Sequence, residues 1–330
     1  MKTDNFTSIN IWLFTCALLV LVITIIGGYT RLSGSGLSIV EWKPLIGTIP
    51  PLNTETWLIE FKKYQLSPEY QLKNYGLSLQ EFKKIFLVEY IHRLVGRITG
   101  LVFLVPFLYF MFQRQILKTL SLQLGGIFIL GLTQAFIGWY MVKSGLTNLP
   151  YVSHYRLALH LGMAMIIYSY LLYLATPTIQ EPHASPTTLL HLKLLTTLIF
   201  IQIIFGAFVS GLKAGLIYNT FPLMNGKIIP EEFSVLSEIS LDKPVFVQYL
   251  HRVTAFFILI YAILIYMTAK PKIKKLYLFK IIPISIIAQF FLGIATLLLI
   301  SPWQLALLHQ LLAVVILSIV VIATKRYNLK

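Results

Sequence analysis

"EYIHRLVGRITGLVFLVPF" (89–107) carries Glu89, His92, Arg93 and Arg97 directly into a run of apolar residues. The apolar run is long enough to cross a membrane as a helix. Ionisable groups are expensive to place at the edge of hydrocarbon, so their presence there indicates a functional role rather than chance. The stretch therefore raises two questions: how many times the chain crosses a membrane, and what these polar side chains bind.

The composition indicates an integral membrane protein. Of the 330 residues, 57% are apolar and only 12% are charged, whereas soluble domains carry about 25% charged residues. Windows of about 20 apolar residues, the length that spans a hydrocarbon core of roughly 30 Å, predict eight transmembrane helices in an all-α protein. The windows lie at Ile9–Tyr29, Ile91–Phe112, Leu122–Met141, Leu157–Leu174, Leu194–Leu212, Leu250–Met267, Ile281–Ile300 and Trp303–Ala323.

The first window is interpreted as a true helix and not as a signal peptide. It is longer than a typical apolar signal region of 7–15 residues, and no small-x-small cleavage motif follows it. Cys16, the only cysteine, lies inside this window, so an intrachain disulfide and a CxxC-type site are excluded.

The net charge of +15 would favour nucleic-acid binding in a soluble protein. Here most basic residues lie beside the spans, and the partner that they indicate is the lipid bilayer, with no nucleic acid. If eight helices alternate in direction, the basic clusters fall on one side, which the positive-inside rule makes cytoplasmic. We therefore expect a multi-pass protein of the inner (plasma) membrane with both termini in the cytoplasm. The clusters comprise Arg114 with Lys118, Lys193, Lys270 to Lys280, and Lys325, Arg326 and Lys330.

The chain also repeats itself. "EYIHRLVGRITGLV" (89–102) is similar to "QYLHRVTAFFILI" (248–260), "QAFIGWYMVKSGL" (134–146) to "QFFLGIATLLLIS" (289–301), and "RLALHLGMAM" (156–165) to "LALLHQLLAV" (305–314). The order of the three is preserved. The pattern predicts two pseudo-repeated four-helix bundles of parallel orientation, an N-terminal half (1–176) and a C-terminal half (191–330), joined by a linker loop (177–190).

The repeat sorts the histidines into pairs. His92 matches His251 and His160 matches His309, and each is expected early in an even-numbered span, near the outer face. Two histidines facing each other in a four-helix bundle are what a bis-histidine haem site requires, so one pair per half predicts two haem sites. For a single histidine the alternative is a hydrogen bond to a neighbouring helix. Surface roles are expected for the remaining three: His154, His183 and His191.

Arg93 and Arg252 follow equivalent histidines. Guanidinium groups pair well with carboxylates such as haem propionates, although a role as an anchor at the membrane edge stays open for each. Arg97 lies four residues after Arg93 and shares its face.

The halves differ at one telling position. Glu89 lies three residues before His92, on the same face, whereas Gln248 stands at the equivalent place before His251. A carboxylate can serve as a base, as a proton relay or as a stabiliser of positive charge on a reacting carbon; a neutral amide cannot take a proton. The asymmetry predicts a permanent redox haem in the C-terminal half and a haem on which chemistry is done in the N-terminal half. The alternative is that Glu89 is a loop charge paired with Arg93 or Arg97.

At these residues the chain resembles a known family. "GGYTRLSGSGLSIVEWKPLIGTIPP" (27–51), "EYIHRLVGR" (89–97), "HLGMA" around His160, "YLHR" around His251 and "LLHQ" around His309 look like haem A synthase, in the form of the alphaproteobacterial and mitochondrial branch. The likeness covers nearly the whole chain.

The resemblance implies an oxidoreductase that oxidises a methyl group of haem O to a formyl group, giving haem A for cytochrome c oxidase. It implies that His251 and His309 ligate the iron of a haem b cofactor and that His92 and His160 contact the substrate haem, where we expect them to ligate its iron. From their positions beside these histidines, Arg252 is expected to bind the haem b cofactor, and Arg93 and Arg97 the substrate haem. It assigns catalysis to Glu89. The implied partners are haem O, the farnesyltransferase that makes haem O and an electron acceptor or donor, and a homo-oligomer is compatible with it. Some relatives carry a cysteine pair in the first outer loop; this chain has none there.

Two other functions give a similar pattern. A di-haem electron-transfer protein of the cytochrome b type would also show four histidines, although it needs haems near both faces of the membrane. A repeat-built transporter would use the histidines as proton or substrate sites.

Overall fold

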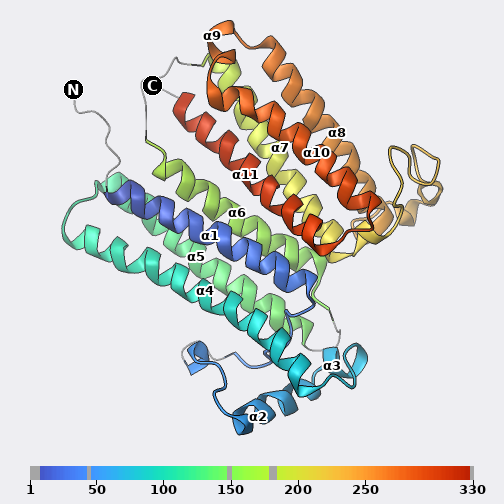
Figure 1. The fold of residues 1–330 in the computed structure, drawn as a ribbon. Helices are drawn as coiled ribbons and strands as arrows, with labels where there is room; N and C mark the ends of the chain where they lie inside the picture. Colours follow the sequence, from blue (N-terminus) through green and yellow to red (C-terminus); the bar gives the residue numbers. More distant parts are fainter. Residues whose placement is uncertain (1–7, 43–45, 147–150, 178–183, 328–330) are drawn as a thin grey trace. The chain divides into compact units, whose positions relative to one another are not determined.

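The computed structural model describes residues 8–42, 46–146, 151–177 and 184–327. In this part of the chain, eight helices are long and apolar enough to cross a membrane, which confirms the all-helical, multi-pass prediction (Figure 1). They are α1 (Ser8–Leu32), α4 (Leu79–Phe112), α5 (Lys118–Gly145), α6 (His154–Ala175), α7 (Pro186–Gly211), α8 (Pro244–Thr268), α10 (Tyr277–Leu298) and α11 (Trp303–Tyr327). The shorter helices are α2 (Thr54–Gln65), α3 (Pro68–Leu72) and α9 (Pro271–Lys274), with single 3-10 turns at Ile46–Thr48, Ala214–Leu216, Glu231–Ser234 and Leu236–Glu238.

α4 begins at Leu79 and not at Ile91. Ser78 and Glu81 form a capping box at its first turn, which satisfies backbone N–H groups that otherwise have no partner. At 1.5 Å per residue its 34 residues span about 50 Å, more than the hydrocarbon core of roughly 30 Å. The helix that carries His92 therefore extends well beyond a membrane.

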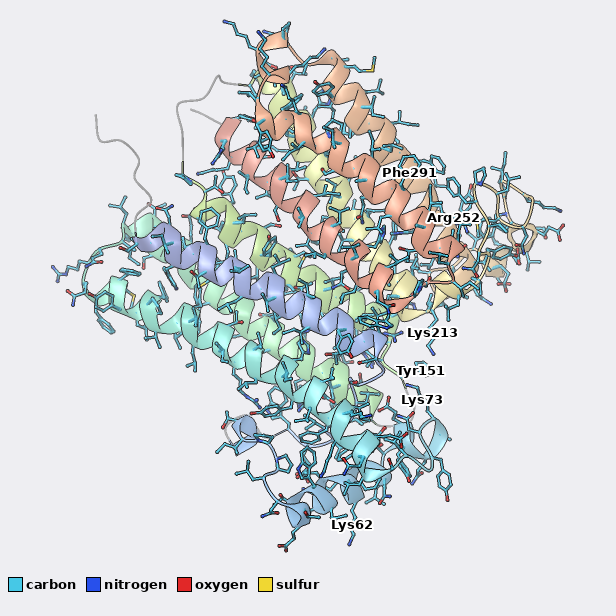
Figure 2. The ribbon with its side chains drawn as sticks, in the orientation of Figure 1. Lys62, Lys73, Tyr151, Lys213, Arg252 and Phe291 are labelled. Atoms are coloured by element: carbon cyan, nitrogen blue, oxygen red, sulfur yellow. The ribbon has the colours of Figure 1, made fainter. Side chains whose placement is uncertain are left out.

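The extension of α4 is covered by the segment that precedes it. α2 and α3 contribute Trp57, Phe61, Tyr64 and Tyr70 to a buried aromatic cluster that packs on Phe82 and Phe86 of α4. Lys62 lies on the outward side of this segment, whereas Lys73 pairs with Glu69 and lies near Gly34; both lysines are labelled in Figure 2. Aromatic burial of this kind stabilises a surface segment that has no membrane around it.

α7 begins inside the predicted linker. The Ser185 side chain accepts a hydrogen bond from the backbone N–H of Thr188, and Pro186 occupies the first turn, where proline lacks an N–H that would have no partner in any case. Residues 186–190 are therefore helix and not loop. The prediction of a surface role for His183 falls outside the described residues.

The chain forms two compact units, Leu18–Ala164 and residues 8–17 with those described from Met165 onward. In the second unit α7 packs against α8, α8 against α10, α10 against α11 and α11 against α7, so that these four helices form a closed ring. Figure 1 shows them side by side. Within the first unit, α4 and α5 are the membrane-length helices that share the most close backbone contacts among the described residues. The division into halves at 1–176 and 191–330 stays a prediction.

Candidate functional site

His251 of α8 and His309 of α11 face each other in the C-terminal half. Their ring centres lie 6.3 Å apart and their planes are inclined by 71°. Two metal–imidazole bonds of about 2 Å each, together with roughly 1 Å from each nitrogen to its ring centre, span about 6 Å. The spacing therefore fits one metal ion held between the two imidazoles.

The ring nitrogen Nδ1 of His309 is buried and has no hydrogen-bond partner among the described residues, and the same is true of Nδ1 of His160. A buried polar atom without a partner costs about 1–3 kcal/mol. Each ring thus has a nitrogen that the protein leaves without a partner, and a neutral imidazole in either tautomer has one nitrogen lone pair with which it can ligate a haem iron.

In the C-terminal pair, His251 and His309 each accept a hydrogen bond from a glutamine on the preceding long helix. Gln202 of α7 donates to the backbone carbonyl of His251 at 2.9 Å and also lies 3.1 Å from its Nδ1. Gln289 of α10 donates to the carbonyl of His309 at 2.9 Å and lies 3.4 Å from its Nε2. Gln202 additionally accepts a hydrogen bond from Thr254.

The N-terminal half has a corresponding pair, His92 of α4 and His160 of α6. The two side chains are close enough to interact electrostatically. Gln134 of α5 donates to the carbonyl of His160 at 3.1 Å and lies 3.5 Å from Nε2 of its ring. Three of the four histidines are thus held by a glutamine, and the exception is His92.

Glycines let the histidine rings lie against the backbone of the neighbouring helix. A methyl group at Gly138 or at Gly293 would lie 2.9 Å from Cε1 of His160 or His309, a distance that Cβ atoms do not tolerate. At Gly27 it would lie 3.3 Å from Nε2 of His92. At Gly206 the distance to Cε1 of His251 would be 3.4 Å, which is an ordinary contact.

Glu89 is buried, with 2% of its surface exposed, and accepts hydrogen bonds from a segment far away in the sequence. Its Oε2 accepts from the backbone N–H of Ser38 at 2.8 Å, from the Ser38 hydroxyl at 2.7 Å and from the N–H of Ile39 at 3.0 Å. Its Oε1 pairs with Arg93 at 2.6 Å. Both carboxylate oxygens are therefore engaged by donors that stabilise negative charge.

The Arg93 guanidinium closes the same arrangement. Besides Glu89 it donates to the backbone carbonyl of Ile39 at 3.0 Å and to that of Glu41 at 3.5 Å. Glu89 and Arg93 together fix the segment that follows α1. The alternative that Glu89 pairs with Arg93 is thus correct as a contact, and the carboxylate is buried rather than exposed on a loop.

In the C-terminal half the same positions are used with reversed hydrogen-bond polarity. Gln248, 3% exposed, donates to the carbonyls of Ala214 at 2.8 Å and Ile217 at 2.6 Å. Arg252, labelled in Figure 2, donates to the carbonyls of Tyr218 at 2.5 Å and Thr220 at 2.8 Å and to Gln248 Oε1. Both arginines thus use much of their donor capacity on backbone carbonyls.

The remaining site candidates are placed as follows. Arg97 lies on α4, one turn after Arg93. His154 is the first residue of α6 and packs on the ring of Tyr155. His191 is partly exposed and forms a 2.8 Å hydrogen bond with Tyr261 of α8; its surface role stays a prediction.

Sequence reasoning missed the three glutamines, although a signal was present. The segments QAFIG (134–138), QIIFG (202–206) and QFFLG (289–293) each place a glutamine and a glycine four residues apart, on one face of a helix. In each, both residues contact the histidine of the next long helix. The recurrence of Q-x-x-x-G before each of these histidines could have identified them.

The ligand set limits the kind of metal site. Among the described residues, no three or more His, Cys, Asp and Glu side chains come together as a metal site. Zinc and non-haem iron sites typically need three or four protein ligands. A pair of histidines suffices when the metal brings its other ligands with it, as iron does in a porphyrin.

Comparison with known proteins agrees with this chemistry. The sequence profile of the family described as cytochrome oxidase assembly protein matches residues 10–321. The chain belongs to this family. Relatives named "Heme A synthase" are 47% identical in Wolbachia pipientis wMel, covering 93% of this chain and 89% of the relative. Those of Nitrosospira multiformis and Rickettsia bellii (strain OSU 85-389) are each 43% identical and cover 94% of this chain, with 91% and 95% of the relative.

Membership of the cytochrome oxidase assembly protein family confirms the resemblance noted from the motifs. The relatives extend over nearly the whole chain, so both histidine pairs and Glu89 lie inside the matched region. The two rival functions, a di-haem electron carrier and a transporter, are not favoured by any of these relatives.

Proposed function

We infer that the chain is a haem A synthase, an oxidoreductase that converts haem O to haem A for the assembly of cytochrome oxidase. The observation that carries this is a buried carboxylate, Glu89, fixed one turn before one of two paired-histidine sites. The relatives named "Heme A synthase" at 43–47% identity support it.

The two sites are proposed to have different occupants. His251 and His309 hold haem b, the resident cofactor, whose bound iron supplies one-electron transfer. His92 and His160 ligate haem O, the substrate, so that the methyl group that reacts lies within the N-terminal half. In the proposed reaction the methyl carbon is oxidised in two successive two-electron steps, first to an alcohol and then to a hydrated aldehyde. In each step one water supplies the oxygen, two protons are released, and two electrons would leave one at a time through haem b to an external electron acceptor. The hydrated aldehyde then loses water to give the formyl group.

Glu89 is proposed to act as a fixed negative charge beside the substrate. Oε2 of Glu89 accepts three hydrogen bonds and Oε1 accepts one from Arg93, so the carboxylate is held in a single orientation. A preorganised carboxylate of this kind stabilises positive charge that develops on the reacting carbon. Of the three roles open to this residue from its sequence position, charge stabilisation fits its contacts best.

The arginines, like the histidines, are assigned to the two haem sites. Arg93 and Arg252 brace the segments that follow α1 and α7, and we propose that their remaining N–H groups pair with propionates of the substrate haem and of haem b. Arg97 is proposed as a partner of a substrate propionate. We also propose that the chain lies in the inner membrane with both termini in the cytoplasm. Its halves are residues 1–176 and 191–330, and the matched contacts of the two halves support a repeat. A farnesyltransferase would supply the haem O.

Expression in cells that make haem O but no haem A tests the function. Pigments extracted from cells with the wild-type chain should contain haem A, and cells with Glu89→Gln should retain haem O, because the change removes the buried charge. A control variant, Glu81→Gln, changes a carboxylate that caps α4 at an exposed position and should leave haem A formation near the wild-type level. Full haem A from Glu89→Gln would remove the assigned role, and absence of haem A with the wild type would overturn the function.

A further inference from the structure

The four histidines differ in how firmly the protein holds them. At His160, His251 and His309, a glutamine amide of the preceding long helix donates to the backbone carbonyl of the histidine, at 3.1, 2.9 and 2.9 Å. A hydrogen bond to the carbonyl fixes the backbone at that position whatever the ring does. None of the described residues makes a side-chain hydrogen bond to the ring or carbonyl of His92.

The difference is built into the helix that faces His92. Its segment ITIIG (23–27) keeps the glycine of the Q-x-x-x-G pattern but has Ile23 where the others have glutamine. Ile23 packs on α4 at Gly96, where a methyl group would lie 3.2 Å from its Cδ1. Three residues after the histidine, Val95 stands where the C-terminal half has Thr254, which donates to Gln202. The polar pair that holds His251 is thus replaced by an apolar pair.

We propose that His92 is the exchangeable axial ligand of this protein: it releases the iron first when the N-terminal half gives up its haem, while His160, His251 and His309 are kept in place by Gln134, Gln202 and Gln289. This inference rests on the proposed function, and it adds the three glutamines and Ile23 as positioning residues. Groups that orient a metal ligand change metal affinity by about 10–100-fold when they are removed.

The asymmetry suits the chemistry required of each half. A substrate haem must enter and a product haem must leave in every catalytic cycle, so at least one of its two iron bonds must break readily. A resident haem has to stay. The helices α7, α8, α10 and α11 form a closed ring, whereas the N-terminal half has fewer close helix approaches. This difference also favours retention of the resident haem.

Release of haem from the full-length protein tests the proposal. The purified chain, loaded with ferric haem b at both sites, is mixed with excess apomyoglobin, and the Soret band reports the transfer. Two phases are expected, and the fast phase should be missing in His160→Ala, which removes a ligand of the N-terminal site. In the ferrous protein, carbon monoxide, which needs an open axial position, should bind the fast-releasing haem first.

Two reciprocal double variants exchange the environments of His92 and His251. Ile23→Gln with Val95→Thr gives His92 the polar pair and should slow the fast phase by about 10-fold or more. Gln202→Ile with Thr254→Val gives His251 the apolar pair and should speed the slow phase by about 10–100-fold. Thr296→Val, which removes a hydroxyl bonded only within α10, should change neither phase.

Unchanged rates in the reciprocal variants, or two haems that leave the wild-type protein at one rate, would overturn the role of His92 and leave the haem A synthase function intact. A wild-type chain that takes up a single haem b would also overturn the role of His92, because no second haem would then be held for it to release. If the Ile23→Gln variant loses its haem altogether, the Gln202→Ile variant decides alone, because an unaltered slow phase there contradicts the proposal.

Discussion

The two halves of the molecule fix equivalent segments with hydrogen bonds of opposite polarity. In the N-terminal half Glu89 accepts from the N–H groups of Ser38 and Ile39, whereas Gln248 donates to the carbonyls of Ala214 and Ile217. Each is braced by an arginine four residues later. The comparison teaches that the exchange of glutamate for glutamine is accompanied by a reoriented backbone, so a negative charge is retained on one side only.

Gln248→Glu should have the largest effect on this comparison. It replaces the N–H groups that face the carbonyls of Ala214 and Ile217 by a carboxylate oxygen. Arg252 can pair with only the other oxygen, and breaking a buried charged arrangement of this kind costs on the order of 3–5 kcal/mol. We expect the C-terminal half to lose its haem at a much lower temperature, measured by the decay of haem absorbance on heating. Gln248→Met, which removes the donors without adding a charge, should cost about 1–3 kcal/mol. Equal losses from both variants would show that charge does not distinguish the halves.

Alanine at the histidine-facing glycines should give graded effects of intermediate size. Gly138→Ala and Gly293→Ala bring a methyl group within 2.9 Å of a histidine ring, and overpacking of this kind costs about 1–3 kcal/mol. Haem should be lost from the N-terminal site in the first variant and from the C-terminal site in the second, as measured by haem content per chain. Gly206→Ala, at 3.4 Å, should be tolerated. A loss with Gly206→Ala as large as with Gly293→Ala would contradict the packing account.

The smallest expected effect is a difference in how acid changes the stability of two segments outside the membrane spans, residues 54–72 and residues 214–235. Burial raises the pKa of Glu69, which lies beside Tyr64 and Lys73, so the folded state binds this proton more tightly and acidification stabilises α3. A hydrogen bond from Tyr218 lowers the pKa of Glu232 and raises that of Tyr218 to about 12. Stability from Glu232 is present above its unfolded pKa and is lost as the pH falls through its lowered folded value.

Hydrogen exchange corrected for intrinsic rates measures both segments in one sample. As the pH falls from about 7 to well below 4, protection of residues 54–72 should rise first, and protection of residues 214–235 should fall once the pH drops through the lowered pKa of Glu232. Glu69→Gln should abolish the first change and Glu232→Gln the second. Parallel changes in the two segments would contradict the assignment of opposite pKa directions.

Much of this architecture is predictable from apolar windows and from histidine spacing. The eight spans follow from hydrocarbon thickness, and the pairing of His251 with His309 follows from the order of the matched segments. The start of α4 at Leu79 is not found by hydropathy, because a capping box and an aromatic cluster with Trp57 extend the helix beyond any membrane. The partners of Glu89 and the role of Gln202 depend on contacts between helices and loops distant in sequence.

The most direct test of the central claim, that the halves hold different haems, is the haem content of single-site variants purified from cells that make haem O. Haem extraction and chromatography of His160→Ala should find haem b without haem O or haem A. His309→Ala should retain haem O and lose haem b. Loss of haem b from His160→Ala, or the same haem composition in both variants, would contradict the division of labour between the two halves.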